Sequence, residues 1–133
     1  MTNTEKVFEY LDKAKVFYVS TVDGDKPKTR PFSFKMIVND TLYFGVGTFK
    51  DCYKQMVKNP HVEIVASDTK GFMRFFGEAA FNDDPALFEE LRRLQPGIAK
   101  MYEENNYTMA FFSLKNATAE MRSLFKVEES LSL

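Results

Sequence analysis

Residues suited to binding a phosphate gather between Tyr43 and Pro60. A strand-like run ends here in Gly-x-Gly-Thr and is followed by a short helical run that carries Lys50 and Lys54. The first turn of a helix has N–H groups without intrahelical partners, and the helix dipole favours an anion there. Thr48 is predicted as the N-cap, with Asp51 at the third helical position. An ordinary capped surface helix with solvated lysines has the same pattern.

A second candidate is the triplet Arg30-Pro31-Phe32, which lies in an extended segment. An arginine at a strand bulge can bind a phosphate through two N–H groups or stack on a flat ring. Pro31 cannot donate to a strand ladder, so it marks an edge or a bulge. A surface arginine beside an edge-strand proline is the alternative. In a small barrel Arg30 would converge with Thr48 and the two lysines, which predicts one shared anion site.

Phe72 and Arg74 lie on one face of a later predicted strand, where they could cover a flat ring or simply pack. His61 follows a proline and has no evident chemical partner, and Cys52 is the only cysteine. No Ser/His/Asp order, carboxylate pair or metal-ligand spacing stands out. We therefore assign no catalytic residue and no metal site.

The elements that must position these residues are strands with few helices. A helix is expected from Thr2, where Glu5 completes a capping-box spacing. Further helices are expected at about Phe49–Lys58, from Asp84-Pro85 to a break at Pro96-Gly97, and over one or two turns of Ile98–Glu104. The strands are predicted at Val16–Val22, from Lys26 in a hairpin, and at Phe32–Val38, Thr41–Val46, Val62–Ser67, Phe72–Phe81, Tyr107–Leu114 and Ala117–Arg122.

Length and composition narrow the function classes. The 133 residues are 44% hydrophobic, which predicts one globular domain over residues 1–133. A net charge of −1 disfavours nucleic-acid binding through phosphate neutralisation. No run approaches the length of a membrane span, and Met1–Lys15 lacks the apolar centre of a signal peptide. With a single cysteine, a reduced, cytoplasmic setting is expected.

Three successive segments carry a family resemblance: TVDGDKPKTRPF, TLYFGVGTFKDCYKQMVKNPHVEIV and GFMRFFGEA. Their order and spacing resemble the pyridoxamine 5′-phosphate oxidase-like flavoproteins, and within them the short, nitroimidazole-resistance-like members. The resemblance runs from about Val7 to Leu114. It implies a mainly β fold with flanking helices: a six- or seven-stranded antiparallel split β-barrel of the FMN-binding type. It also implies a homodimer with two FMN grooves at the subunit interface.

Site residues carried over by position from the resemblance fall into four groups. Arg30, Pro31 and Phe32 would run along the isoalloxazine and ribityl chain. Val46, Gly47 and Thr48 would line the ribityl-phosphate end, while Lys50 and Lys54 would neutralise the phosphate. Phe72 and Arg74 match a segment, often Trp-x-Arg in relatives, that approaches the cofactor from the partner chain.

The resemblance implies that the protein is an FMN-dependent oxidoreductase. Such an enzyme would pass electrons from a reduced nicotinamide to a small planar acceptor such as a nitroaromatic or quinone. Lys35 or Arg74 would place positive charge near the N1/C2 end of the flavin. The chain ends in FKVEESLSL, without the arginine-bearing extension of the true oxidase, so oxidation of a vitamin B6 phosphate is not expected. The alternatives are a non-catalytic flavin- or haem-binding protein, since some relatives bind haem or a deazaflavin, and an interaction protein without a ligand.

Overall fold

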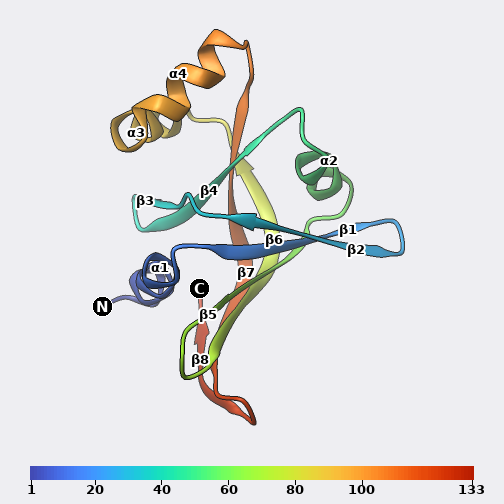
Figure 1. Ribbon diagram of the computed structural model, residues 1–133, viewed down its shortest axis with the longest axis vertical. Coiled ribbons are helices and arrows are strands. Elements are labelled where there is room, and N and C mark those ends of the chain that lie inside the picture. The colour runs from blue at the N-terminus through green and yellow to red at the C-terminus, as the bar shows by residue number, and fades with distance from the viewer.

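The computed structural model describes residues 1–133 and contains four helices and eight strands (Figure 1). The helices are α1 Asn3–Ala14, α2 Asp51–Lys58, α3 Pro85–Leu94 and α4 Pro96–Glu104. The strands are β1 Phe17–Asp23, β2 Lys26–Phe32, β3 Met36–Val38, β4 Thr41–Gly47, β5 His61–Ser67, β6 Phe72–Asn82, β7 Met109–Arg122 and β8 Val127–Ser132. None of the helices is long and apolar enough to cross a membrane.

The strands form one antiparallel sheet in the order β2-β1-β5-β6-β7-β4-β3, and β8 pairs with β7. The mainly β, antiparallel architecture with flanking helices is therefore confirmed. The predicted six or seven strands are corrected to eight, and the sheet is not closed. Its two end strands, β2 and β3, do not pair with each other. We call the gap between the end of β2 and the β3–β4 hairpin the seam.

Two strand boundaries differ from the prediction at the C-terminal end. The segments Tyr107–Leu114 and Ala117–Arg122 belong to one long strand, β7, which bends but does not break. The strand β8 is not predicted from the sequence. Only one of its side chains, Leu131, is buried, and its charges indicate a solvated tail. Pairing with the far half of β7, rather than local pattern, makes this segment a strand.

The helix starts follow local sequence signals. The N–H of Glu5 donates to Thr2 Oγ1 at 3.1 Å, and the N–H of Thr2 donates to Glu5 Oε1 at 3.0 Å, which completes the predicted capping box. The Asp84 carboxylate accepts from the N–H of Ala86 at 2.9 Å, and Pro85 occupies the first helical position. These caps fix where α1 and α3 begin.

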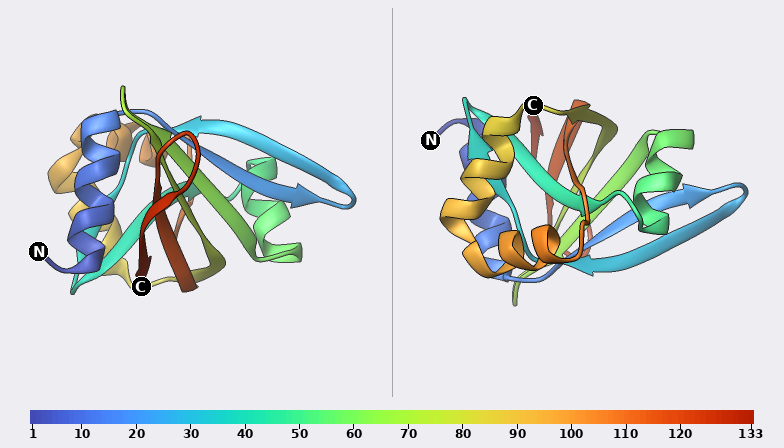
Figure 2. Two further views of the ribbon diagram at one scale, coloured as in Figure 1. Left: turned by 90° about the horizontal axis from the view of Figure 1, so that it is seen from below. Right: turned by 90° about the horizontal axis from the view of Figure 1, so that it is seen from above.

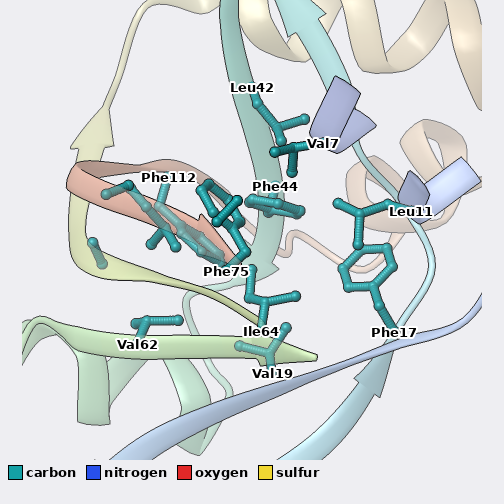
Figure 3. Close-up of a cluster of buried hydrophobic side chains, with 14 of the residues drawn as sticks. Val7, Leu11, Phe17, Val19, Leu42, Phe44, Val62, Ile64, Phe75 and Phe112 are labelled. Carbon is teal, nitrogen blue, oxygen red and sulfur yellow. The ribbon is translucent and has the colours of Figure 1, made fainter. Parts of the chain in front are cut away.

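The core is aromatic and lies inside the curved sheet, with α1 covering one end. Phe17, Phe44 and Phe112 are fully buried, and their rings meet at centroid distances of 5.4–5.6 Å (Figure 3). Val7 and Leu11 of α1 point into the same cluster. The helices α1 and α2 lie at opposite sides of the strands, and the β1–β2 hairpin projects past α2 (Figure 2).

A smaller cluster holds α3 against the β3–β4 hairpin. It contains Leu87 and Leu91 from α3 together with Met36, Tyr43 and Phe111. Since α4 follows α3 after a single residue, this cluster also sets where α4 lies. The result is that α4 contributes side chains to the seam.

Candidate functional site

A groove of about 590 Å³ lies at the seam, between the end of β2, the end of β4 and α4. It collects side chains from segments far apart in the sequence, because the open sheet leaves β2 and β4 facing each other without hydrogen bonds. Six of the ten residues carried over from the family resemblance line it: Arg30, Pro31, Phe32, Val46, Gly47 and Lys50.

Arg30 is held in place by both the sheet and α2. Its Nη1 donates to Thr21 Oγ1 at 2.7 Å and to the carbonyls of Val19 and Lys28, and its Nη2 donates to Gln55 Oε1 at 2.8 Å. A guanidinium has five N–H donors, and the Nε donor has no partner within the chain. Arg30 is thus oriented in advance and keeps donors for a ligand.

Lys50 stands at the start of α2 and forms no ion pair or side-chain hydrogen bond within the chain. The prediction of Thr48 as the N-cap is wrong: the N-cap is Lys50, and no side chain caps the helix. The N–H of Thr48 instead donates to the carbonyl of Thr108 at 2.9 Å, which continues the β4–β7 ladder and delays the helix. The first N–H groups of α2 are therefore left without a side-chain acceptor.

The positive charges of Arg30 and Lys50 both act on the side chain of Cys52. Cys52 lies in the groove wall and is buried. Burial raises the pKa of its thiol, and this effect dominates, while the charges of Arg30 and Lys50 act in the opposite direction. Two cations from different elements therefore lie close to one buried group, at the end of the groove next to α2.

Thr48 and Lys54, also predicted for the site, lie outside this groove. Thr48 lines a neighbouring pocket of about 310 Å³ together with Tyr53 and Phe81. Lys54 lines a depression of about 870 Å³ between α2 and the β1–β2 hairpin. That depression is larger than the groove, but Lys54 is the only one of the predicted site residues in its walls.

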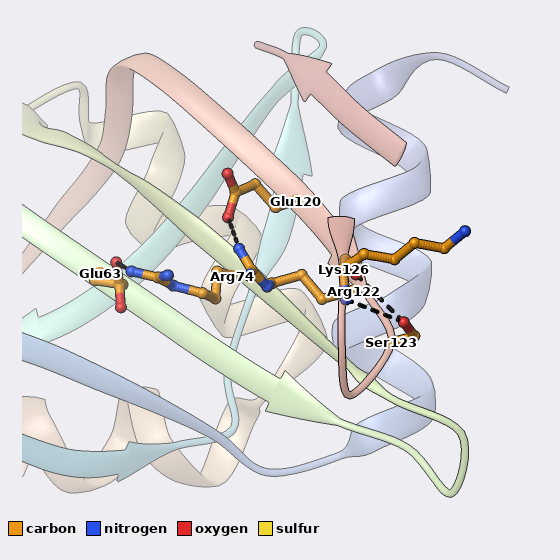
Figure 4. A network of polar contacts seen from close by, with 6 residues as sticks. All are labelled: Glu63, Arg74, Glu120, Arg122, Ser123 and Lys126. Atoms are coloured by element: carbon orange, nitrogen blue, oxygen red, sulfur yellow. Dashed lines mark hydrogen bonds and ion pairs between the residues drawn. The ribbon is translucent and has the colours of Figure 1, made fainter. Parts of the chain in front are cut away.

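Phe72 and Arg74 lie at the opposite end of the sheet from the groove. They pair with the half of β7 that also pairs with β8, whereas β4 pairs with the other half. Arg74 forms an ion pair with Glu63 at 2.8 Å, next to the pair of Arg122 and Glu120 at 2.8 Å (Figure 4). These side chains are too distant to meet a ligand held in the groove of the same chain.

One further expectation, the role of Lys35, changes with the structure. Lys35, proposed to supply charge near the flavin, is only 11% exposed in its side chain and pairs with Asp12 of α1 at 2.7 Å. A Cβ added at Gly45 would lie 2.5 Å from Met109 Sδ, and one at Gly47 would lie 2.6 Å from the ring of Phe49. The space beside the two glycines is thus filled by the protein's own side chains.

The sequence analysis missed several groove residues. Gln55 positions Arg30, and its spacing of three from Cys52, on the inner side of α2, is the only signal for it. Ile98 and Tyr102 reach the groove from α4 at a spacing of four, which is equally typical of core packing. No local pattern assigns either residue to a ligand site.

The chain is similar to known proteins in both sequence and structure. Residues 3–128 match the family described as pyridoxamine 5′-phosphate oxidase. A NimC/NimA family protein from Clostridium acetobutylicum has 31% identity and a TM-score of 0.88, with 100% of this chain and 95% of that chain covered. No curated protein matched.

Two more distant structures share the fold. General stress protein 26 from Bacillus anthracis has 19% identity and a TM-score of 0.68, with all of both chains covered. The heme storage protein HutZ from Vibrio cholerae has 14% identity and a TM-score of 0.62, with 86% of this chain and 90% of that chain covered. Identities this low show the fold alone.

Proposed function

Because the chain belongs to the pyridoxamine 5′-phosphate oxidase family, we propose that it is an FMN-binding flavoprotein whose cofactor lies in the groove at the seam. The observation that carries the proposal is the gathering of Arg30 and Lys50 at one end of a groove with apolar walls elsewhere. A phosphate suits the cationic end, and a planar ring suits the walls formed by Phe32, Phe34 and Met109. The groove's volume of about 590 Å³ is typical of small-molecule sites.

The residues at the cationic end divide the work of holding a phosphate. Arg30 offers a planar donor group that Thr21 and Gln55 already orient, so little freedom is lost on binding. Lys50 adds a compact charge at the start of α2, where N–H groups lack a side-chain acceptor. Asp51 also lines the groove, and its negative charge favours a phosphate position on the Arg30 side.

The activity we propose is electron transfer from a reduced nicotinamide to a small planar acceptor such as a nitroaromatic or quinone. FMN, when bound, supplies the two-electron chemistry. The chain binds the phosphate, and its apolar wall excludes water from one face of the ring. Since Lys35 is paired with Asp12, it does not supply charge to the ring.

We propose further that two copies form the working unit. Phe72 and Arg74 face outward at the far end of β6 and cannot reach the groove of their own chain. In a homodimer they would instead approach the groove of the second copy. Arg74 would then supply the positive charge that Lys35 does not.

A non-catalytic flavin- or haem-binding protein is the rival function, since the heme storage protein HutZ has the same fold. His61, the only histidine, is exposed and lies outside the groove. The groove therefore offers no imidazole ligand for a haem iron.

The absorption spectrum of the purified protein, before and after titration with FMN, tests the proposal. We expect flavin bands and saturable binding, and then bleaching of the bands by reduced nicotinamide under anaerobic conditions and recovery with a quinone. A Soret band would favour haem binding. Binding of FMN without any turnover would support a passive binder, and failure to bind FMN would overturn the proposal.

A further inference from the structure

Tyr102 of α4 is a buried tyrosine whose hydroxyl has no partner in the chain. The residue is 6% exposed and lines the groove. None of the chain's hydrogen bonds involves its Oη. The chain has no fully buried side-chain oxygen or nitrogen without a partner, so this oxygen is not fully buried. The hydroxyl therefore keeps some accessible surface, and the residue that carries it lines the groove. Since Tyr102 lines the groove and its hydroxyl has no partner in the chain, the O–H is free to donate to a molecule bound there.

The hydroxyl lies beside the junction of β4 and α2. A Cβ built on Gly47 would be 2.9 Å from Tyr102 Oη, so only a glycine leaves room for it there. The carbonyl of Gly47 accepts from the N–H of Lys50 at 3.0 Å. Tyr102 therefore brings a donor from α4 to the end of the groove where Lys50 and the first turn of α2 lie.

The ring of Tyr102 is fixed by its neighbours. Its centroid is 5.8 Å from that of Tyr107, in an edge arrangement, and 6.2 Å from that of Phe49. The N–H of Tyr107 also donates to the carbonyl of Tyr102 at 2.8 Å. Burial raises the pKa of Tyr102, so the hydroxyl keeps its proton at neutral pH and acts as a donor. A donor held in this way binds without losing rotational freedom.

We propose that Tyr102 Oη donates a hydrogen bond to the phosphate of the bound flavin nucleotide and so lets the groove distinguish FMN from riboflavin. This inference rests on the proposed function. It adds a third donor, from α4, to Arg30 of β2 and Lys50 at the start of α2. The phosphate is then held by three elements that no sheet hydrogen bond joins across the seam.

The test is the affinity of wild type and Tyr102→Phe for FMN and for riboflavin, measured by quenching of flavin fluorescence. Loss of a hydrogen bond to a charged group should weaken FMN binding by roughly tenfold or more. Riboflavin lacks the phosphate, so its affinity should change by less than about twofold. The substitution keeps the ring, so thermal unfolding of the apo-protein should be unchanged.

Tyr107→Phe is the matched control. Tyr107 belongs to the same aromatic group, but it is 43% exposed and does not line the groove. The Tyr107→Phe variant should bind FMN and riboflavin with the affinities of the wild type. Equal FMN affinity of wild type and Tyr102→Phe, or an equal loss for both flavins, would overturn the inference and leave the proposed function standing. A wild type that binds no FMN would overturn both.

Discussion

At the residue scale, two lysines four positions apart reach different parts of the surface. Lys50 precedes the first turn of α2 and lines the groove with Arg30. Lys54 lies inside the helix and faces the depression beside the β1–β2 hairpin. The difference follows from where α2 begins, since a start at Thr48 would have placed both lysines within the helix, four positions apart and on one face.

We expect Lys50→Ala to weaken FMN binding by roughly tenfold, because a charge-assisted contact to phosphate contributes about 1.5–3 kcal/mol. Lys54→Ala should change the affinity by less than twofold, and it serves as the matched control because it removes the same charge from the same helix. Isothermal titration of both single variants at one salt concentration would measure this. A larger loss of affinity in Lys54→Ala would indicate that the phosphate binds on the other side of α2.

Sequence alone brings Arg30 and Lys50 to the groove, but it misses Gln55 and Tyr102. Arg30 stands out because a proline follows it, and Lys50 stands out because it comes shortly after a Gly-x-Gly-Thr sequence at the end of a strand-like run. Gln55 and Tyr102 do not stand out, because their roles depend on contacts between α2 and β1 and between α4 and β4. Such tertiary contacts have no local pattern.

At the element scale, α1 is tied to the segment between β2 and β3. Lys35 in that segment pairs with Asp12 of α1 at 2.7 Å and lies over the ring of Phe8 at 5.2 Å. The hydrogen bond and charge of Lys35 lower the pKa of Asp12. This contact connects the helix that covers the core with the strand connection next to the groove.

Since the pKa of Asp12 is lower in the folded than in the unfolded chain, its contribution to stability is full above the usual aspartate range. It is lost as pH falls through the lowered value. Asp12→Asn should therefore be less stable than wild type at neutral pH, and the difference should shrink towards about pH 3. Urea unfolding at both pH values measures it. Asp83→Asn, which removes an exposed carboxylate without an ion pair, is the control, and a pH-independent difference for Asp12→Asn would contradict the assignment.

Elements with local signals are predictable here, and those without are not. The capping box joins Thr2 and Glu5, and the start of α3 joins Asp84 and Pro85. Each signal spans no more than four residues of the chain, so the sequence contains each in full. The strand β8 depends on pairing with β7 and has a single buried residue, Leu131. Its two adjacent charges, Glu128 and Glu129, are typical of a solvated tail, and only the partner strand makes the segment a strand.

At the scale of the whole molecule, one outward face of β5, β6 and β7 combines rings with paired charges. Arg74 lies over the ring of Phe76 at 5.9 Å, and Arg122 lies over that of Phe72 at 5.8 Å. Their carboxylate partners lie on the same face, which Figure 4 shows. A face with both signs of charge can be self-complementary about a two-fold axis.

We therefore expect light scattering to give twice the 15.4 kDa mass of the chain. Arg74→Glu should shift the protein towards the monomer, because it adds a third carboxylate beside Glu63 and Glu120 and so removes the balance of charge that makes this face self-complementary. It should also weaken FMN binding if the second copy completes the groove. Lys115→Glu, at an exposed position without an ion pair, is the control. A wild-type monomer that binds FMN tightly would contradict the dimer.

The open seam has a consequence for how the protein responds to its ligand. The strands β2 and β3 are the two ends of the main strand order, and the connection 33–35 is the only chain between them. A molecule bound across the seam contacts the protein on both sides of the gap, as an additional strand between them would. Amide hydrogen–deuterium exchange should then slow at the ends of β2 and β4, which line the groove, on loading, with little change in the central β5 and β6. The bound molecule would then act as a structural part of the fold that bridges the gap in the sheet.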